Sequence, residues 1–62
     1  MADNAQLEAM LDRMVEAQHA LIFTAAEAAV IPSDKSLRKI ADLESAIRAV
    51  EDLLEHREGR PA

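Results

Sequence analysis

The residues best suited to chemistry in this sequence are Glu16 and His19, which stand three positions apart. A Glu-x-x-His pair supplies a carboxylate and an imidazole to the di-metal sites of ferritin-like bundles, where both side chains point into the bundle. Here the pair lies on the helix face away from Leu7, Met14 and Leu21, and the sequence has no second pair of this spacing. We therefore expect an exposed polar pair and no metal ligand, and a helical metal-binding module stays only as an alternative.

Catalysis by acid–base or nucleophilic groups is not expected either. His19 and His56 are of a type that titrates near neutral pH, but no nucleophile is arranged beside them, and the chain has no cysteine. The sequence also lacks the Gly-rich turns that mark nucleotide or dinucleotide sites. We predict a protein that is not an enzyme, with no catalytic residue and no cofactor.

A basic cluster at residues 35–39 is the one concentration of positive charge. Lys35, Arg38 and Lys39 stand where a second helix is expected to begin, so they could bind an acidic partner beside free helix N–H groups, or simply balance Glu27 and Asp42. The net charge of −5 opposes binding to nucleic-acid phosphates and to anionic lipid. We therefore expect no nucleic acid and no membrane among the partners.

The spacing of apolar residues predicts a first helix over about residues 4–30. Asp3 or Asn4 can cap its start, and Pro32 ends it because proline disfavours helical geometry at the preceding residue. Apolar residues at seven-residue intervals are typical of helical bundles. These positions are Leu7, Met14, Leu21 and Ala28, with Met10, Ala17 and Thr24 three residues after the first three.

A second helix is predicted over about residues 34–57, capped by Ser33 or Asp34. Its apolar seam alternates steps of three and four residues and consists of Ile40, Leu43, Ile47, Val50 and Leu54. A turn of about residues 31–34 joins the helices, and so short a link favours antiparallel neighbours. The tail at 58–62 is expected to fray. The sequence thus predicts one all-α domain, an antiparallel helical hairpin over residues 1–62.

The stretch from Ala20 to Ile31 is apolar almost all round the predicted helix, with Glu27 as its single charge. One partner helix cannot cover such a surface, and a 62-residue domain without disulfides is commonly stabilised by oligomerisation. We expect a homodimer that forms a four-helix bundle. The residues expected to mediate self-association are Leu7, Met14, Leu21, Ile22, Phe23, Ile40, Leu43, Ile47, Val50 and Leu54.

This plan resembles that of the small antiparallel hairpin dimers typified by the plasmid RNA-modulating protein Rop, in architecture and not in any residue motif. The resemblance implies a dimeric four-helix bundle, and it leaves an RNA-binding hairpin dimer as an alternative function that the negative charge opposes. A structural assembly component of a phage or a secretion system is another alternative.

The function that we expect is that of a small regulatory or adaptor protein, which dimerises and binds or inhibits a partner protein through an exposed helix face. Phe23 is the sole aromatic residue and lies outside the main seam, so we expect it in self-association or in partner binding. A cytoplasmic location is expected, because no secretory signal is recognised and the apolar run at 20–31 is too short to span a bilayer. The residues that could contact a partner are Phe23, Ala26, Val30, Lys35, Arg38 and Lys39.

Overall fold

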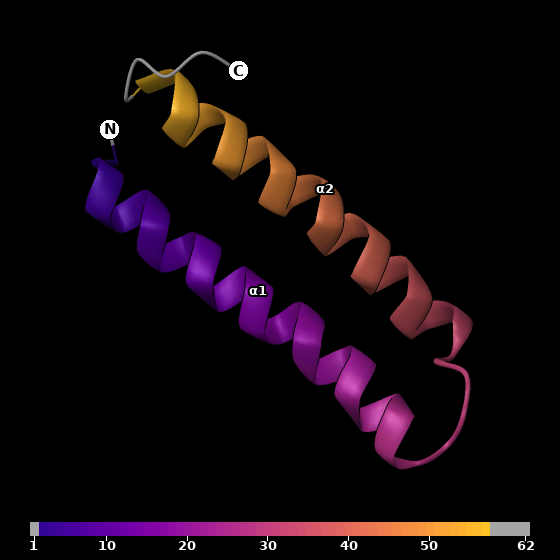
Figure 1. Cartoon of the computed structure of the whole chain (residues 1–62). Helices are drawn as coiled ribbons and strands as arrows, with labels where there is room; N and C mark the ends of the chain where they lie inside the picture. Colours follow the sequence, from indigo (N-terminus) through magenta and orange to yellow (C-terminus); the bar gives the residue numbers. More distant parts are fainter. Residues whose placement is uncertain (1, 58–62) are drawn as a thin grey trace.

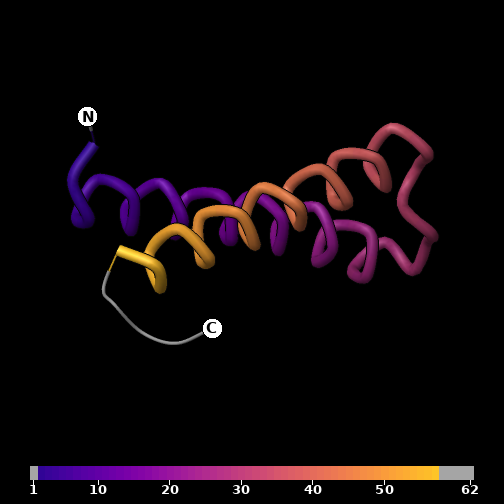
Figure 2. Tube along the Cα trace, turned by 90° about the horizontal axis from the view of Figure 1, so that it is seen from above, coloured from indigo at the N-terminus to yellow at the C-terminus, as the bar shows by residue number. Residues whose placement is uncertain are grey.

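The computed structural model describes residues 2–57, which form two helices of 24 residues each, α1 (Asn4–Glu27) and α2 (Asp34–Arg57). The helices pack against each other as a hairpin (Figure 1), which confirms the predicted all-helical hairpin. Viewed from above, α1 and α2 cross at a shallow angle near the middle of their length (Figure 2). The predicted frayed tail at 58–62 lies outside the described residues.

Both helices begin at side chains that satisfy free backbone N–H groups. Before α1, the backbone N–H of Gln6 donates to Asp3 Oδ1 over 2.8 Å, and the backbone N–H of Asp3 donates to Gln6 Oε1 over 3.0 Å. This reciprocal arrangement is a capping box. Before α2, the backbone N–H of Ser36 donates to Ser33 Oγ over 3.1 Å. Asp3 and Ser33 are therefore the caps, each one of the two residues that the sequence offered.

The end of α1 differs from the prediction, which placed it near Val30. The helix ends at Glu27, and Ala29 then takes a positive φ of 55°. The backbone N–H of Val30 donates to the Ala25 carbonyl over 3.0 Å, and that of Ala29 donates to the Ala26 carbonyl over 3.1 Å. These two bonds form a Schellman motif, which satisfies the last carbonyls of the helix and reverses the chain. The Schellman motif, and not Pro32, therefore ends α1.

The core is a single layer of side chains between the two helices. Leu7, Val50 and Leu54 form a buried cluster in the half of the hairpin that holds the chain ends, and Met10, Leu11 and Met14 pack against it. No large side chain of residues 2–57 is completely buried. The hairpin therefore leaves much of its apolar surface exposed to solvent.

The seam of α1 is rotated relative to the predicted one. Residues of α1 that follow Leu7 in alternating steps of four and three, as far as Ala25, are all buried or half-buried. Ala17 and Thr24, expected in the seam, are exposed, whereas Met10 is half-buried and packs against the core. On α2 the predicted seam is confirmed, since Ile47, Val50 and Leu54 are buried and Ile40 and Leu43 are half-buried. The residues of α1 that face α2 are Leu7, Leu11, Met14, Gln18, Leu21 and Ala25.

No helix within residues 2–57 combines the length and the apolar character that crossing a membrane requires.

Candidate interaction surfaces

One side of the hairpin carries a group of glutamates from both helices, and we call it the acidic side. Glu8 of α1 and Glu51 of α2 line the same depression of about 470 Å³, so these two positions face the same way. Each directly follows a core residue, and Glu44 takes the equivalent place one heptad earlier on α2. Glu55 and Arg48 line the same depression. The acidic side is thus defined by Glu8, Glu44, Arg48, Glu51 and Glu55.

The opposite side follows from the same geometry. Six residues, each directly preceding a seam residue, face away from the acidic side. They precede Leu11, Gln18 and Ala25 on α1 and Ile40, Ile47 and Leu54 on α2. Of these six residues, Lys39 is the only charged one. The others, together with the half-buried residues at the adjoining edge of the seam, form what we call the uncharged side. It consists of Met10, Met14, Ala17, Leu21 and Thr24 on α1 and of Leu43, Ala46 and Leu53 on α2.

A second depression, of about 390 Å³, lies on α2 at the uncharged side. It is lined by Lys39, Asp42, Leu43 and Ala46, which follow one another in steps of three, one and three residues. Four residues at this spacing form one lozenge on the surface of a helix. The apolar centre of the depression is thus provided by the stem of Lys39 and by two small or branched side chains.

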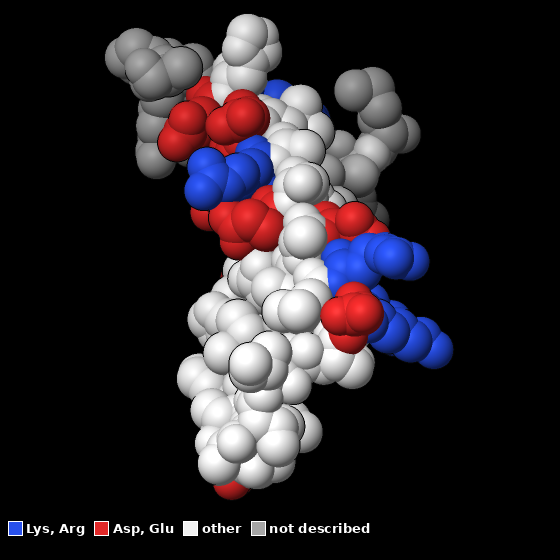
Figure 3. Space-filling model, turned by 90° about the vertical axis from the view of Figure 1, so that its right-hand side faces the viewer, with Lys and Arg blue, Asp and Glu red and all other residues white. Residues whose placement is uncertain are grey.

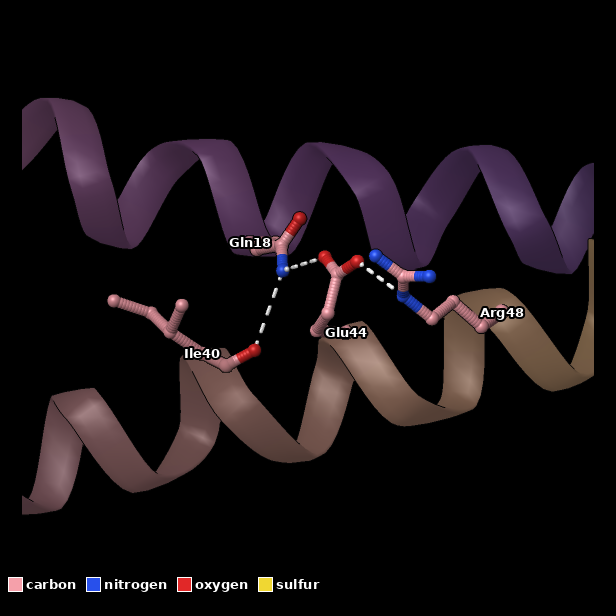
Figure 4. A network of polar contacts seen from close by, with 4 residues as sticks. All are labelled: Gln18, Ile40, Glu44 and Arg48. Carbon is pink, nitrogen blue, oxygen red and sulfur yellow. Dashed lines mark hydrogen bonds and ion pairs between the residues drawn. The ribbon is translucent and has the colours of Figure 1, made fainter.

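A polar contact joins the helices near their middle (Figure 4). The amide group of Gln18 donates to Glu44 Oε1 over 3.0 Å and to the backbone carbonyl of Ile40 over 3.2 Å. Arg48 Nε donates to Glu44 Oε2 over 2.9 Å in an exposed ion pair. The hydrogen bond from Gln18, followed by that from Arg48, lowers the pKa of Glu44 below its ordinary value of 4.5.

The spacing of apolar residues in the sequence does not single out Gln18. In the structure Gln18 is just 8% exposed and is the only buried polar residue of the described chain. The spacing of Gln18 could have indicated its burial, because Gln18 follows Met14 by four residues and precedes Leu21 by three. A polar residue at a seam position predicts a partner across the interface, since buried polar groups are nearly always hydrogen-bonded.

Exposed apolar side chains gather toward the connection between the helices. Phe23 is 59% exposed and Ile22 is 41% exposed, and with exposed Ala26 they form what we call the Phe23 patch. The ring of Phe23 lies 5.8 Å from that of His19, centroid to centroid. Val30 and Ile31 are also exposed, the latter by 84%. Figure 3 shows the lower part of the molecule almost free of acidic and basic side chains.

The candidate metal-ligand pair and the basic cluster both lie on the exposed surface of the hairpin. Glu16 and His19 are both exposed, and no group of three metal-ligating side chains occurs within residues 2–57. Lys35, Arg38 and Lys39 are exposed at the start of α2. In the part of the chain that the structure describes, Arg48 and Glu44 form the only ion pair, so no residue of the basic cluster is in direct ionic contact with Glu27 or Asp42.

Comparison of the chain with protein-family models, with curated proteins and with solved structures finds no match. The uncharged side and the Phe23 patch are therefore the features of the molecule that point to a function.

Proposed function

We propose that this protein is a small cytoplasmic regulatory or adaptor protein that forms a homodimer and binds a partner protein, without catalysing a reaction. The observation that supports this proposal is the presence of two separate apolar surfaces on one thin hairpin. The uncharged side runs along both helices, and the Phe23 patch lies near the connection. Exposed apolar patches mark interaction sites in small proteins, and two such surfaces allow two different contacts.

The Phe23 patch is the better candidate for the foreign partner. Aromatic side chains supply a large share of interface energy when a partner buries them, and Phe23 is already exposed with its ring held beside His19. Lys35 and Arg38 stand at the same end of the hairpin, where α2 begins. A partner with an apolar groove and acidic groups at its rim would match both features, and by covering that groove the protein would block other ligands of the partner.

Affinity capture with two variants at one position tests this role. The wild-type protein, Phe23→Ser and Phe23→Leu are each immobilised and exposed to the same lysate, and bound proteins are identified by mass spectrometry. We expect a partner that the wild type and Phe23→Leu retain and Phe23→Ser loses, because leucine still fills an apolar groove and serine does not. Equal capture by all three forms would contradict a binding role for the patch.

Sedimentation of the purified protein tests the second half of the proposal. We expect a dimer at micromolar concentration whose melting temperature rises with concentration, because folding and association are coupled in small dimers. A folded monomer at all concentrations would refute homodimerisation. Growth beyond the dimer into open assemblies would instead favour a structural assembly component, since contacts between unlike surfaces do not close.

A further inference from the structure

We infer that a second copy of this chain covers the uncharged side, with its side chains entering the depression on α2, and that the Phe23 patch stays open in the dimer. This inference rests on the proposed homodimerisation and adds the surface through which it takes place. Three features of the described residues carry it: the shape of α2, the available area and the distribution of charge.

The depression on α2 has the form of a hole for a side chain of another helix. Its lining residues Lys39, Asp42, Leu43 and Ala46 are the four corners of one lozenge on the helix surface. In packed helices each such hole receives one apolar side chain from the facing helix. Helix α1 does not fill this hole, because the seam that faces α1 is on the neighbouring face of α2.

The uncharged side also offers the side chains to fill such a hole. Leu53 is 44% exposed on the same line of α2, and Met10 and Leu21 are half-buried on α1. Between them, near the middle of each helix, stand the small residues Ala17 and Ala46. Large side chains toward both ends and small ones in the middle let two identical surfaces approach closely and interdigitate. Two such surfaces packed about a two-fold axis would bring the small residues of both copies together in the middle.

The available area matches that of a stable dimer. A helix of 24 residues is about 36 Å long, and two helices side by side are about 20 Å wide. One side of the hairpin therefore covers on the order of 700 Å². Each partner in a stable protein complex buries about 800 Å², so the whole uncharged side is needed.

The distribution of charge also favours contact with a second copy through the uncharged side. Each chain has a net charge of −5, so two copies repel unless their carboxylates stay apart. Glu8, Glu44, Glu51 and Glu55 are on the acidic side, opposite to the proposed interface. At the interface, Lys39 and Asp42 carry opposite signs. Packing through the uncharged sides thus points the acidic sides of both copies outward.

Chemical cross-linking at single introduced cysteines tests the surface directly, because the natural chain has none. We expect Ala46→Cys and Ala17→Cys to form covalent dimers with a short bismaleimide. Ala41→Cys is the matched control, since Ala41 lies four residues after Leu37 and three before Glu44, toward the acidic side. Efficient linkage at Ala41 and none at Ala46 or Ala17 would overturn the inferred surface.

Sedimentation of two glutamate variants separates this inference from the proposed function. Ala46→Glu would place an unpaired charge in the interface of each copy, and we expect dimerisation at least about 100-fold weaker. Ala41→Glu adds the same charge outside the interface and should leave the dimer almost unchanged. If the wild type is a dimer but Ala46→Glu dimerises equally well, the surface is wrong and homodimerisation stands. If the wild type is a monomer, both the homodimerisation and the inferred surface are refuted. If Ala46→Glu does not fold, the cross-linking result decides between the surfaces.

Discussion

Gln18 of α1 donates its side-chain amide to Glu44 of α2 over 3.0 Å, within a seam that is otherwise apolar. The same amide also donates to the Ile40 carbonyl, so it contacts two groups one helical turn apart. A shift of one helix along the other would separate Gln18 from both acceptors, whereas most apolar side chains would find new apolar neighbours. We therefore expect this contact to fix the alignment of the helices more than it adds to stability, as buried polar residues do in coiled coils.

Replacing the amide of Gln18 by a carboxylate should expose its role. In Gln18→Glu the donor is lost and a second negative charge stands beside Glu44 at a position only 8% exposed. We expect a loss of about 1–3 kcal/mol in the free energy of unfolding at neutral pH, with partial recovery in acid. Denaturant titration at both pH values measures it. Ala9→Glu adds the same charge at an exposed site of α1, and a loss of equal size there would contradict the prediction.

The pH dependence of stability should carry a contribution from Glu44, whose pKa is lowered by the hydrogen bonds from Gln18 and then Arg48. Because the folded-state pKa lies below the unfolded value, ionised Glu44 stabilises the fold above the ordinary value of 4.5, and the effect is lost as the pH falls through the lowered pKa. We expect Glu44→Gln to reduce the drop in melting temperature between about pH 6 and about pH 3. An unchanged drop would contradict this, and Glu16→Gln, an exposed carboxyl on the other face of the hairpin, is the control.

The Schellman motif offers a stabilising substitution with a built-in control. Ala29 has a positive φ of 55°, a region that costs any residue with a Cβ atom but not glycine. We expect Ala29→Gly to raise the free energy of unfolding by about 0.5–1 kcal/mol. The neighbouring Ala28 has a helical φ of −81°, so Ala28→Gly should lower it by a similar amount. Thermal melting compares the two, and changes of equal sign would refute the assigned geometry of the turn.

Truncation of a buried seam residue should cost far more than truncation of an exposed one. Ile47 is only 6% exposed in the seam of α2, and we expect Ile47→Ala to lose about 2–5 kcal/mol. Glu16 is exposed, and Glu16→Ala should change stability by less than about 0.5 kcal/mol. Equal losses in denaturant titration would show that the face of α1 assigned to the core is wrong.

The arrangement of the two helices was predictable because its signals are local. Capping residues at Asp3 and Ser33, the steps of three and four in α2 and the short connection each point to the same hairpin. The rotation of the α1 seam was not predictable from spacing alone. Met10, Ala17 and Thr24 compete with Leu11, Gln18 and Ala25 for the seam, and the polar Gln18 makes the second set look worse. Its hydrogen bonds across the interface, which exist only after packing, reverse that preference.

The end of α1 could not be predicted for a similar reason. Alanine has the highest helix propensity, so Ala28 and Ala29 favour continuation, and no glycine marks the reversal. The chain nevertheless turns at Ala29, and the hydrogen bonds from Ala29 and Val30 to the last carbonyls of α1 form only once the chain has turned. The exposure of Phe23 was predictable, because Phe23 lies outside the seam. The hole on α2 was not predictable, because it depends on which sides of the two helices remain uncovered after packing.

The hydrogen bond from Arg57 Nη1 to the Ala2 carbonyl, over 3.0 Å, brings positions that are 55 residues apart to the same end of the molecule. An arginine side chain is shorter than three extended residues, so a linker of about three residues could join Arg57 to Ala2. A circularly permuted chain, opened between Val30 and Ser33, would then present α2 before α1 while retaining every contact between them. We therefore expect the fold not to depend on the order in which the two helices are synthesised.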